Sequence, residues 1–437
     1  MPKYLIFGVL LVLATSLKCI AREHWKFAFD ERSGFTRVAV SDQYSDERGF
    51  GFEPGASLSI VKGRSSDGSV LEATAPFYFS AQVPEGNYRV TVRFGGGSKA
   101  SQTTVKAELR RLMVEHVLTD AGQTVERTFI VNVRRSQIRP RDAIGAGSVK
   151  LKAPREVVQE AWAWDDRLTL EFDGTAIAIA SIEIDPVQVP TLYIMGDSTV
   201  CDQSGEPYAS WGQMLTRWFK PSIAIANHAE SGETYDAAFA RRRIDKILSV
   251  IEPGDFFIVQ FGHNDQKEDL KSGRTAFTHY QQNIERCVGD VRAKGGAPLL
   301  VTPMERRQFN PDGTLHPSLV EYAEAVRRVG LKLDVPVIDL NAMSQVFYRA
   351  LEARGKGDSA KAFALTDTTH HNDYGAYELS RCVALGIWNA NTKLKTYLFD
   401  QTKSFDPAHP EDPDAFDLPA SPKKTTMRPL GDRSKGS

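Results

Sequence analysis

Residues 191–199 read Thr-Leu-Tyr-Ile-Met-Gly-Asp-Ser-Thr, a short apolar run that ends in a glycine and three small polar residues. Apolar runs of this length, bounded by turn residues, are typical of buried β-strands. A glycine permits the tight turn that must follow such a strand. The stretch therefore predicts a strand that delivers Ser198 to the edge of a sheet.

Downstream of this strand, short apolar runs alternate with longer amphipathic stretches. The further runs span Ser222–Ala226, Phe256–Phe261, Pro298–Thr302 and Val335–Leu340. Helical periodicity is found around Trp211–Phe219, Tyr235–Ile251, Phe277–Lys294, Leu319–Leu333, Ala342–Arg354 and Tyr374–Trp388. Such alternation predicts an α/β domain, a parallel sheet with helices on both faces, which carries its functional residues at the carboxyl ends of the strands.

The region upstream differs because its apolar residues alternate with polar ones. The alternating sets lie within Phe77–Val83, Tyr88–Phe94, Phe129–Val133 and Leu168–Phe172. A period of two places these side chains on one face of a half-buried strand. Turn residues at Pro84–Asn87 and at Asp173-Gly174 separate the runs, so residues 22–187 are predicted to form an all-β sandwich. The segment Pro186–Pro190 is predicted to link it to the α/β domain of residues 190–398.

The two ends of the chain have compositions of their own. Lys3, the apolar run Leu5–Ala14 and the residues Cys19-Ile20-Ala21 have the layout of a signal peptide over residues 1–21. The apolar run is shorter than the roughly 18 residues that a membrane-spanning helix needs. We therefore expect an exported protein, periplasmic or secreted, without a membrane span. Residues 399–437 are rich in proline and charge and have no apolar periodicity, which predicts a disordered tail.

Charge and cysteine content narrow the function classes. The chain contains 54 Lys and Arg against 55 Asp and Glu, a formal net charge of −1. This balance gives no indication of a nucleic-acid or membrane-surface partner. After the signal peptide, Cys201, Cys287 and Cys382 remain, which form one disulfide at most and match no zinc motif. No metal or organic cofactor is expected, and the number of associating chains stays open.

Four polar segments lie where the predicted elements meet. Ser198 follows the first strand, Gly232 follows the second in Glu-Ser-Gly-Glu, and Asn264 follows the third in Gly-His-Asn-Asp. Asp367 and His370 stand three residues apart before the last helix, where a hydrogen bond between them would fix the imidazole tautomer. Each segment has a plain structural alternative, namely a helix cap, a turn or the end of a strand. Their order favours nucleophilic catalysis, in which a serine needs a base and oxyanion donors.

In these blocks the chain resembles the GDSL or SGNH hydrolases, whose four marker residues would be Ser198, Gly232, Asn264 and His370. Gly-His-Asn-Asp after the third strand and Asp-x-x-His near the end of the domain look like the rhamnogalacturonan acetylesterase group, which deacetylates pectic polysaccharide. The resemblance covers roughly residues 191–395 and is specific, because all four blocks appear in order. It implies a three-layer α/β/α, flavodoxin-like fold and a serine esterase that acts on a polysaccharide or oligosaccharide.

The resemblance also implies a role for each residue. Ser198 would attack the ester carbonyl, and His370 would take its proton and return it to the departing sugar hydroxyl. Asp367 would orient His370. The oxyanion would rest on the backbone N–H groups of Ser198 and Gly232 and on the side-chain amide of Asn264.

Several neighbouring residues carry weaker indications. His263 and Asp197 are expected to brace the loops around the nucleophile. Arg306 and Arg307 follow the fourth strand at the same edge of the sheet, where one of them would pair with a galacturonate carboxylate, because arginine suits bidentate carboxylate recognition. His371 is expected to be exposed or to line the cleft. Arg306, Arg307 and His371 are therefore the predicted substrate-binding residues.

The sandwich carries no candidate triad, and two interpretations of it stay open. It is either a spacer that shapes the cleft or a carbohydrate-binding module, since it resembles the galactose-binding-like sandwiches found beside pectin-active esterases. Trp25, Tyr44, Trp162 and Trp164 would stack on sugar in the second case or fill the core in the first. For the whole chain, the alternatives are an esterase for acetylxylan, pectin methyl ester or lipid ester, or a polysaccharide-binding protein without catalysis. The complete serine–histidine–aspartate set argues against the last.

Overall fold

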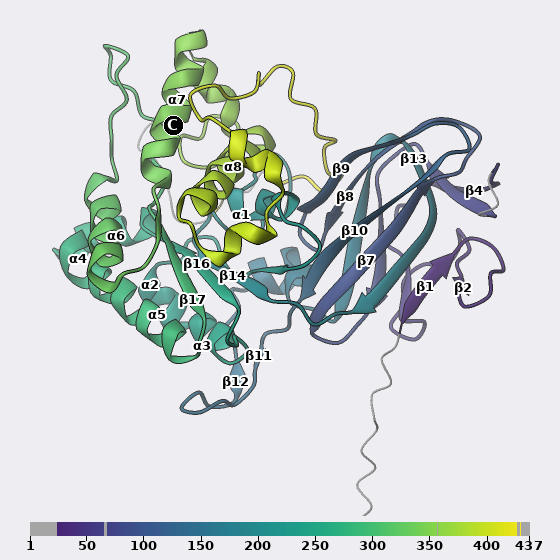
Figure 1. Cartoon of the computed structure of the whole chain (residues 1–437), viewed down its shortest axis with the longest axis horizontal. Helices are drawn as coiled ribbons and strands as arrows, with labels where there is room; N and C mark the ends of the chain where they lie inside the picture. Colours follow the sequence, from purple (N-terminus) through teal and green to yellow (C-terminus); the bar gives the residue numbers. More distant parts are fainter. Residues whose placement is uncertain (1–23, 65–67, 356, 426–428, 430–437) are drawn as a thin grey trace, which may run out of the picture.

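The predicted signal peptide lies outside the residues that the computed structural model describes, which are 24–64, 68–355, 357–425 and 429. Figure 1 shows a β-rich domain beside a domain of mixed strands and helices. The chain leaves the first domain at Pro186, where its last strand ends, and the first strand of the second begins at Thr191. Both predicted fold classes, an all-β sandwich and an α/β domain, are confirmed.

The sandwich strands of the described chain are β1 (Trp25–Ala28), β2 (Thr36–Arg37), β3 (Phe50–Phe52), β4 (Leu58–Lys62), β5 (Ser69–Ala73), β6 (Phe77–Gln82), β7 (Gly86–Gly95), β8 (Ser101–Ala107), β9 (Arg111–Thr119), β10 (Thr124–Val133) and β13 (Arg167–Pro186). A small separate pair consists of β11 (Gln137–Ile138) and β12 (Gly147–Ser148). The first half of β13 pairs with β6 and β8, and its second half pairs with β5, β7 and β1. One long strand therefore belongs to both sheets and ties the sandwich together.

The alternation of apolar residues produces the sandwich core. On β6, Phe77, Phe79 and Ala81 are all buried. The Phe79 ring packs edge-on against Phe27 and Phe52, with ring centroids 5.0 and 5.5 Å apart. Aromatic pairs in this arrangement bury large apolar areas in a favourable geometry. The core of this domain is thus formed by the side chains that the alternating pattern predicts to face inward.

One predicted turn is wrong. Asp173-Gly174, expected to separate two strands, lies inside β13, whose register against β8 shifts between Asp173 and Ala176. Gly174 has a φ of 141°, and a Cβ there would come within 2.5 Å of the Gln102 carbonyl oxygen. The glycine therefore forms a bulge that bends one strand from the first sheet into the second.

The second domain contains a parallel sheet of β14 (Thr191–Gly196), β15 (Ala224–Asn227), β16 (Phe256–Gln260), β17 (Ala297–Val301) and β18 (Val337–Ile338). In the described chain these strands lie in the order β15-β14-β16-β17-β18. This is the order of a flavodoxin-like sheet. Because the strands are parallel, their carboxyl ends meet at one edge, where Ser198 follows β14 between the loops after β15 and β16.

The helices of this domain are α1 (Trp211–Met214), α2 (Tyr235–Ala240), α3 (Arg243–Leu248), α4 (His263–Ser272), α5 (Gln281–Ala293), α6 (Val320–Leu333), α7 (Leu340–Arg354) and α8 (Asp373–Asn389). On β14, Leu192 and Ile194 belong to a core shared with α1, α7 and α8. Tyr193 and Met195 belong to the core shared with α2, α3, α5 and α6. Successive strand residues point to opposite faces of the sheet. A strand that is apolar throughout therefore packs against helices on both faces, which gives three layers. Helix α4 was not predicted, because its sequence is polar on nearly every side.

The tail contradicts the expectation of disorder over its described part, residues 399–425. Phe405 is buried in the core shared with α8. Further along, the Ser421 hydroxyl accepts hydrogen bonds from Lys106 at 2.8 Å and from Arg110 at 2.9 Å, both in the sandwich. In Figure 1 this yellow segment runs from beside α8 to the sandwich. The composition of the segment did not predict this packing, because a few separate residues such as Phe405 and Ser421 hold the segment and no repeated apolar pattern does.

The turn between β8 and β9, residues 108–110, reaches into the α/β domain. The guanidinium of Arg110 donates to the Tyr208 carbonyl at 2.8 Å and forms ion pairs with Glu206 at 2.6 Å and Asp373 at 3.0 Å. These groups are largely buried, and buried charges are tolerated when they are paired and hydrogen-bonded. The two domains therefore share a specific, polar interface.

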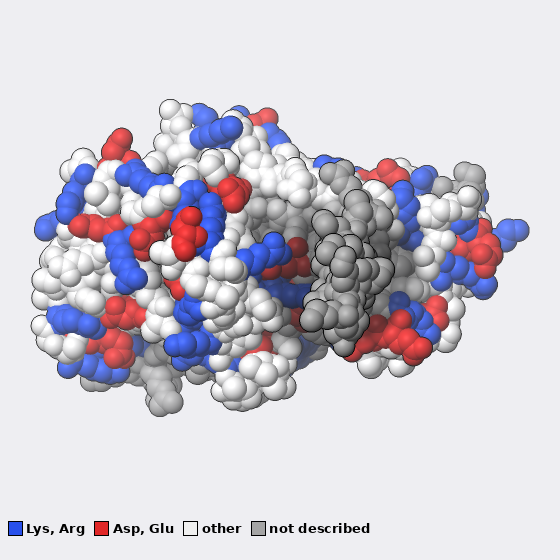
Figure 2. All heavy atoms as spheres, turned by 90° about the horizontal axis from the view of Figure 1, so that it is seen from below, with Lys and Arg blue, Asp and Glu red and all other residues white. Residues whose placement is uncertain are grey.

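The distribution of surface charge and the state of the three cysteines are consistent with the near-zero net charge and the low cysteine content. On the face that Figure 2 shows, acidic and basic side chains are interspersed over both domains. No helix of the described residues combines the length and the apolar character required to cross a membrane. Cys201, Cys287 and Cys382 are buried, and none of them is bridged within the described chain. These cysteines serve packing.

Candidate active site

Three side chains from distant parts of the α/β domain meet at the carboxyl edge of its sheet. Ser198 lies two residues beyond β14, and His370 lies three residues before α8. The Ser198 Oγ is 2.9 Å from His370 Nε2, and His370 Nδ1 is 2.9 Å from Asp367 Oδ2. A hydroxyl, an imidazole and a carboxylate thus form one chain of hydrogen bonds. This geometry allows the imidazole to remove the proton of the hydroxyl.

The carboxylate of this chain is positioned by its own turn. Asp367 Oδ1 accepts hydrogen bonds from the backbone N–H groups of Thr369 at 2.8 Å and His370 at 3.1 Å, which leaves Oδ2 for the imidazole. Ser198 and His370 are 1% exposed, and Asp367 is 5% exposed. Charges interact more strongly at such buried positions than in water. A positive charge on the imidazole would therefore be stabilised by the adjacent carboxylate.

Further buried groups fix the backbone beside Ser198. Asp197 Oδ1 accepts from the Thr199 backbone N–H at 3.0 Å and hydroxyl at 2.8 Å, and Asp197 Oδ2 lies 3.4 Å from His263 Nδ1. Burial alone would raise the pKa of Asp197, but His263 and the bonds from Thr199 outweigh burial and lower it. Gln203 Nε2 donates to the Ser198 carbonyl at 2.6 Å. The turn that carries Ser198 is therefore held on both sides.

The other two predicted oxyanion donors, Gly232 and Asn264, lie in the 230–233 loop and at the start of α4. Gly232 has a φ of 73°, a conformation that favours glycine, in the loop of residues 230–233 after β15. The backbone N–H of Glu230 donates to the Gly196 carbonyl at 3.1 Å, which places this loop against the turn that carries Ser198. Asn264 Nδ2 donates to the Glu233 carbonyl at 3.0 Å. The 230–233 loop and the start of α4 are thus joined beside the nucleophile.

A lysine from the sandwich side of the molecule holds the 230–233 loop. Lys152 Nζ donates to the Ser231 carbonyl and pairs with the Glu233 carboxylate at 2.5 Å. The Glu233 side chain is 0% exposed, and a carboxylate buried to this degree requires such a partner. Lys152 precedes β13 in the chain and lies outside the α/β domain. The sequence contains no signal for this contact, because Lys152 and Ser231 are 79 residues apart.

Arg155 makes a second contact of this kind. Its guanidinium lies between the carboxyl groups of Glu230 at 3.0 Å and Glu160 at 2.6 Å. Burial, together with the neighbouring Glu230, raises the pKa of Glu160 to about 9, so that Glu160 retains a proton at neutral pH. Arg155 Nη2 also donates to Gln203 Oε1 at 3.4 Å. One cation therefore connects the 230–233 loop to the residue that holds the Ser198 carbonyl.

The two predicted arginines occupy different environments. Arg306 is 5% exposed, and its guanidinium donates to Gln266 Oε1 at 2.9 Å and to the Ser318 hydroxyl at 3.0 Å. Arg307 is half-buried, and its backbone N–H donates to the Thr368 carbonyl at 2.8 Å. Arg306 therefore braces loops, whereas Arg307 lies against the loop that contains Asp367.

His371 is buried, which corrects the expectation that it would be exposed. It is 2% exposed, and its Nε2 lies 3.0 Å from the Tyr348 hydroxyl. Its ring centroid lies 4.2 Å from that of Phe363. Burial, with the adjacent His370, lowers the pKa of His371 to about 3. The ring is therefore neutral and packs with the aromatic side chains of Tyr348 on α7 and Phe363.

The structure offers no arrangement for a metal ion among the described residues, because no group of three or more His, Cys, Asp or Glu side chains is suitably placed. His263 is fully buried beside Asp197. Its position supports the loop that carries Asn264.

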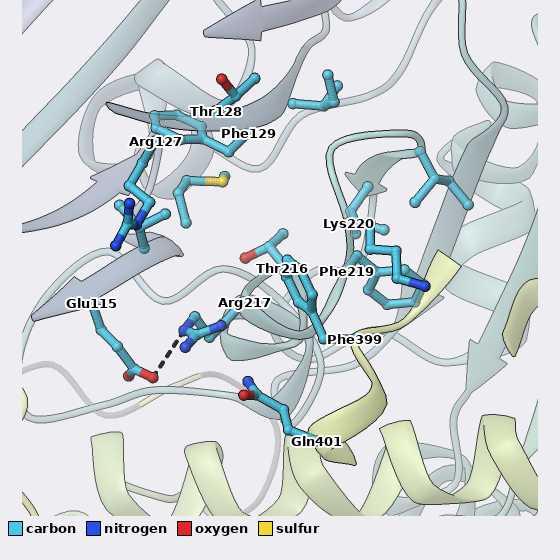
Figure 3. A pocket seen from close by; sticks show the side chains of 15 residues that line it. Glu115, Arg127, Thr128, Phe129, Thr216, Arg217, Phe219, Lys220, Phe399 and Gln401 are labelled. Carbon is cyan, nitrogen blue, oxygen red and sulfur yellow. Dashed lines mark hydrogen bonds and ion pairs between the residues drawn. The ribbon is translucent and has the colours of Figure 1, made fainter. Parts of the chain in front are cut away.

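The sandwich aromatics all contact other side chains. The pairs are Trp25 with Tyr88, Tyr44 with Arg167, Trp162 with Tyr78 and Trp164 with Arg134. A cavity of about 340 Å³ lies between the domains and is lined by Phe129, Arg217 and Phe399, among others. Figure 3 shows the ion pair there between Arg217 and Glu115, which are 2.8 Å apart. This cavity adjoins the amino end of β15, at the opposite edge of the sheet from Ser198.

Comparisons with known proteins agree with this geometry. Residues 194–376 match the GDSL-like Lipase/Acylhydrolase family. Rhamnogalacturonan acetylesterase RhgT of Bacillus subtilis (strain 168) is 34% identical over 228 residues, which are 49% of this chain and 94% of that protein. Probable rhamnogalacturonan acetylesterase YesY of the same organism is 31% identical over 202 residues, 45% of this chain and 91% of YesY.

A longer match includes the sandwich. Uncharacterized esterase YxiM of Bacillus subtilis (strain 168) is 26% identical over 399 residues, 86% of this chain and 94% of YxiM. RhgT exceeds 30% identity and is covered almost in full by this chain. The chain therefore belongs to the GDSL-like (SGNH) hydrolase family and is a carboxylic ester hydrolase.

Proposed function

We propose that the protein is a serine esterase that removes O-acetyl groups from a pectic polysaccharide, rhamnogalacturonan. The observation that carries the proposal is the hydrogen-bonded chain from Ser198 through His370 to Asp367, with both distances at 2.9 Å. The acetyl group and the pectic substrate are supported by the names of the relatives RhgT and YesY. A polymer outside the cell membrane also fits the export predicted from residues 1–21.

The first half of the proposed reaction acylates the enzyme. His370 Nε2 takes the proton of Ser198 Oγ while Oγ bonds to the acetyl carbonyl carbon, and Asp367 stabilises the resulting imidazolium. The carbonyl oxygen becomes an oxyanion that accepts hydrogen bonds from the N–H groups of Ser198 and Gly232 and from Asn264. His370 then gives the proton to the sugar oxygen as the ester C–O bond breaks. The sugar hydroxyl leaves, and acetyl-Ser198 remains.

The second half returns the enzyme to its starting state. A water molecule gives one proton to His370 and bonds to the acetyl carbon, and the proton then returns to Ser198 Oγ as acetate departs. The side-chain amide of Asn264 has two hydrogens. One is donated to the Glu233 carbonyl, and the other is free to donate to the oxyanion. The proposed steps use protein groups and water, so chelators are expected to leave the rate unchanged.

The acidic backbone of the polysaccharide is proposed to contact Arg307. The donors of Arg306 are already bonded to other side chains, whereas Arg307 Nε has no hydrogen-bond partner among the described residues. Arg307 Nη1 donates to the Ser359 hydroxyl only over 3.4 Å, and a guanidinium in this position can donate to a galacturonate carboxylate. Arg307→Gln should lower kcat/KM on acetylated pectin about ten-fold, the value of one hydrogen bond to a charged group, and change the rate on a chromogenic acetate little.

The exposed Arg349 on α7 supplies the matched control, because Arg349→Gln removes the same charge at a nearby surface position. Equal losses on pectin and on the small ester would contradict a contact between Arg307 and the substrate. Equal losses in the Arg307 and Arg349 variants would show that charge acts at a distance instead.

The substrate class is tested by product release from the full chain. Purified protein is incubated with acetylated rhamnogalacturonan, acetylated xylan and methyl-esterified pectin, with Ser198→Ala as the control. Acetate released fastest from rhamnogalacturonan is the expected result. Faster release from xylan, or methanol from pectin, would replace the proposed substrate. No hydrolysis of any ester, including a chromogenic acetate, would favour a polysaccharide-binding protein without catalysis.

A further inference from the structure

We propose that a second site, on the boundary between the two domains, binds a small oxyanion that carries a hydroxyl group, such as a sugar acid or hydrogen phosphate. The site is a cavity of about 260 Å³. Its lining includes Arg134 and Arg139 from the sandwich side and His228 and Lys246 from the α/β domain. It is separate from the Ser198 site, and the inference goes beyond the proposed esterase reaction.

Arg134 is the anchor of this site. Its side chain is 5% exposed, and its Nε and Nη1 atoms are buried without a hydrogen-bond partner among the described residues. Asp202, Glu108 and Glu156 act on its charge from a longer range, but no carboxylate of the described chain accepts a hydrogen bond from Nε or Nη1. The guanidinium lies over the Trp164 ring, 4.6 Å from its centroid, so stacking holds the donors in place. An arginine that is ordered but has no acceptor is prepared to receive one.

The charge of Arg134 cannot be relieved by loss of its proton. Burial, with the neighbouring Arg111, lowers the pKa of Arg134 only to about 10, so it is charged at neutral pH. Buried charges in proteins are almost always paired, and a buried donor without an acceptor points to an absent water or ion. An oxyanion in the cavity would satisfy this requirement.

The cavity is also lined by other charged groups. Three cations, Arg134, Arg139 and Lys246, line it together with one carboxylate, Glu85. Glu85 lies 2.5 Å from Lys246 and 3.8 Å from Arg139. Asp202, Glu108 and Glu156 lie outside the lining and act on Arg134 from a longer range, so an anion is favoured by the unbonded donors of Arg134 and not by a count of charges.

Two neutral groups restrict the ligand further. His228 Nδ1 is buried without a hydrogen-bond partner among the described residues, and burial beside Arg134 keeps the pKa of His228 well below its usual value. A neutral imidazole can donate one N–H. The Asn132 Oδ1 atom also lacks a partner among the described residues, and its amide nitrogen already donates to Asn87. Because Asn132 Oδ1 can only accept a hydrogen bond, the ligand needs a hydroxyl to donate to it as well as a negative charge for the cations.

The cavity of Figure 3 provides the contrast. Arg217 there pairs with Glu115 at 2.8 Å, and Lys220 Nζ donates to the Thr396 carbonyl at 3.1 Å, so these two cations of the lining have acceptors. Arg127, which also lines it, is exposed. Of these two cavities, the one at Arg134 therefore has buried cationic donors that lack an acceptor among the described residues.

The test measures the thermal stability of the full chain in galacturonate or in sodium phosphate, against sodium chloride at equal ionic strength. A ligand that binds the folded state raises Tm by mass action, by about 2–4 °C at ten times its Kd. Arg134→Met should abolish this rise, and the variant is compared with itself in chloride because it also loses the stacking on Trp164. Arg127→Gln, in the other cavity, should keep the full rise. The separate galacturonate and phosphate titrations identify which class of oxyanion is bound.

Arg139→Gln gives a second variant that should fold, since the Arg139 side chain is 69% exposed. It is expected to weaken binding several-fold and to leave hydrolysis of a chromogenic acetate unchanged. That assay measures the esterase independently, so failure of the anion site and failure of the proposed function are distinguishable. The site is disproved if neither anion gives a saturable rise in the unmodified protein, or if the rise persists in Arg134→Met. A Tm loss in Arg134→Met that is equal in chloride and in anion would assign Arg134 a structural role instead.

Discussion

The two halves of the candidate active site are held in different ways. The serine–histidine–aspartate half is built within the α/β domain, where the turn that contains Asp367 positions its own carboxylate through backbone N–H groups. The half that contains the predicted oxyanion donors depends on the 230–233 loop, which is held by Lys152 and Arg155 from outside that domain. The comparison indicates that proton transfer and oxyanion stabilisation can be disturbed separately.

The largest effect is expected from Ser198→Ala, which removes the proposed nucleophile. The rate on a chromogenic acetate should fall by about 10⁴-fold or more, as for the loss of other catalytic serines. Among the described residues, His370 is the hydrogen-bond partner of the Ser198 hydroxyl, so Tm should change little. Retention of more than a few per cent of the rate would remove Ser198 from the mechanism.

A smaller loss is expected when one oxyanion donor is removed. Asn264→Ala should lower kcat by about 100- to 1,000-fold with little change in KM, because the donor acts on charge that develops in the transition state. Steady-state kinetics on the same ester separates the two constants. A variant that raised KM with kcat intact would place Asn264 in substrate binding instead.

Breaking the contact between Lys152 and the 230–233 loop should also lower kcat, but by less than the loss of Asn264. Lys152→Met removes the donor to the Ser231 carbonyl and the nearest of three cations around Glu233, where Arg241 at 3.4 Å and Arg243 at 3.7 Å remain. We expect kcat to fall by about 10- to 100-fold, since small displacements of catalytic groups have effects of this size, with KM nearly unchanged.

Two further variants test whether Lys152 acts by positioning. Lys152→Arg should restore much of the rate, because it retains the charge. Lys150→Met, at an exposed lysine of the same stretch, should have the rate of the unmodified protein. Loss of Tm in Lys152→Met without loss of kcat would show that the lysine supports the fold alone.

The smallest effect concerns pH and the cluster around Arg155. Burial raises the pKa of Glu160 from 4.5 to about 9 in the folded state, so folding retains a proton that the unfolded chain releases. This contribution to stability is fully present below pH 4.5 and is lost as pH rises toward 9. Tm should therefore decline over this range, and Glu160→Gln should flatten the decline. Parallel Tm curves for the two proteins would contradict the shift.

Much of the fold could be predicted because its signals are local. A period of two around Phe77–Val83 can bury one face only as a strand, and the run at residues 191–195 precedes a helix pattern that requires a parallel sheet. The site could be predicted in outline for the same reason. Ser198, Gly232 and Asn264 directly follow strands, and parallel strands end at a common edge.

What the sequence by itself determined was therefore the identity of the two domains and the order of the residues around the nucleophile, because periodicity and strand ends are properties of neighbouring residues. The tertiary structure alone decided that Gly174 bends a continuous strand, that Phe405 anchors the tail, and that His371 is buried. It also decided that Lys152 holds the 230–233 loop and that Arg134 Nε and Nη1 have no acceptor among the described residues. Each of these depends on groups far apart in the chain, whose meeting is set by how the two domains pack.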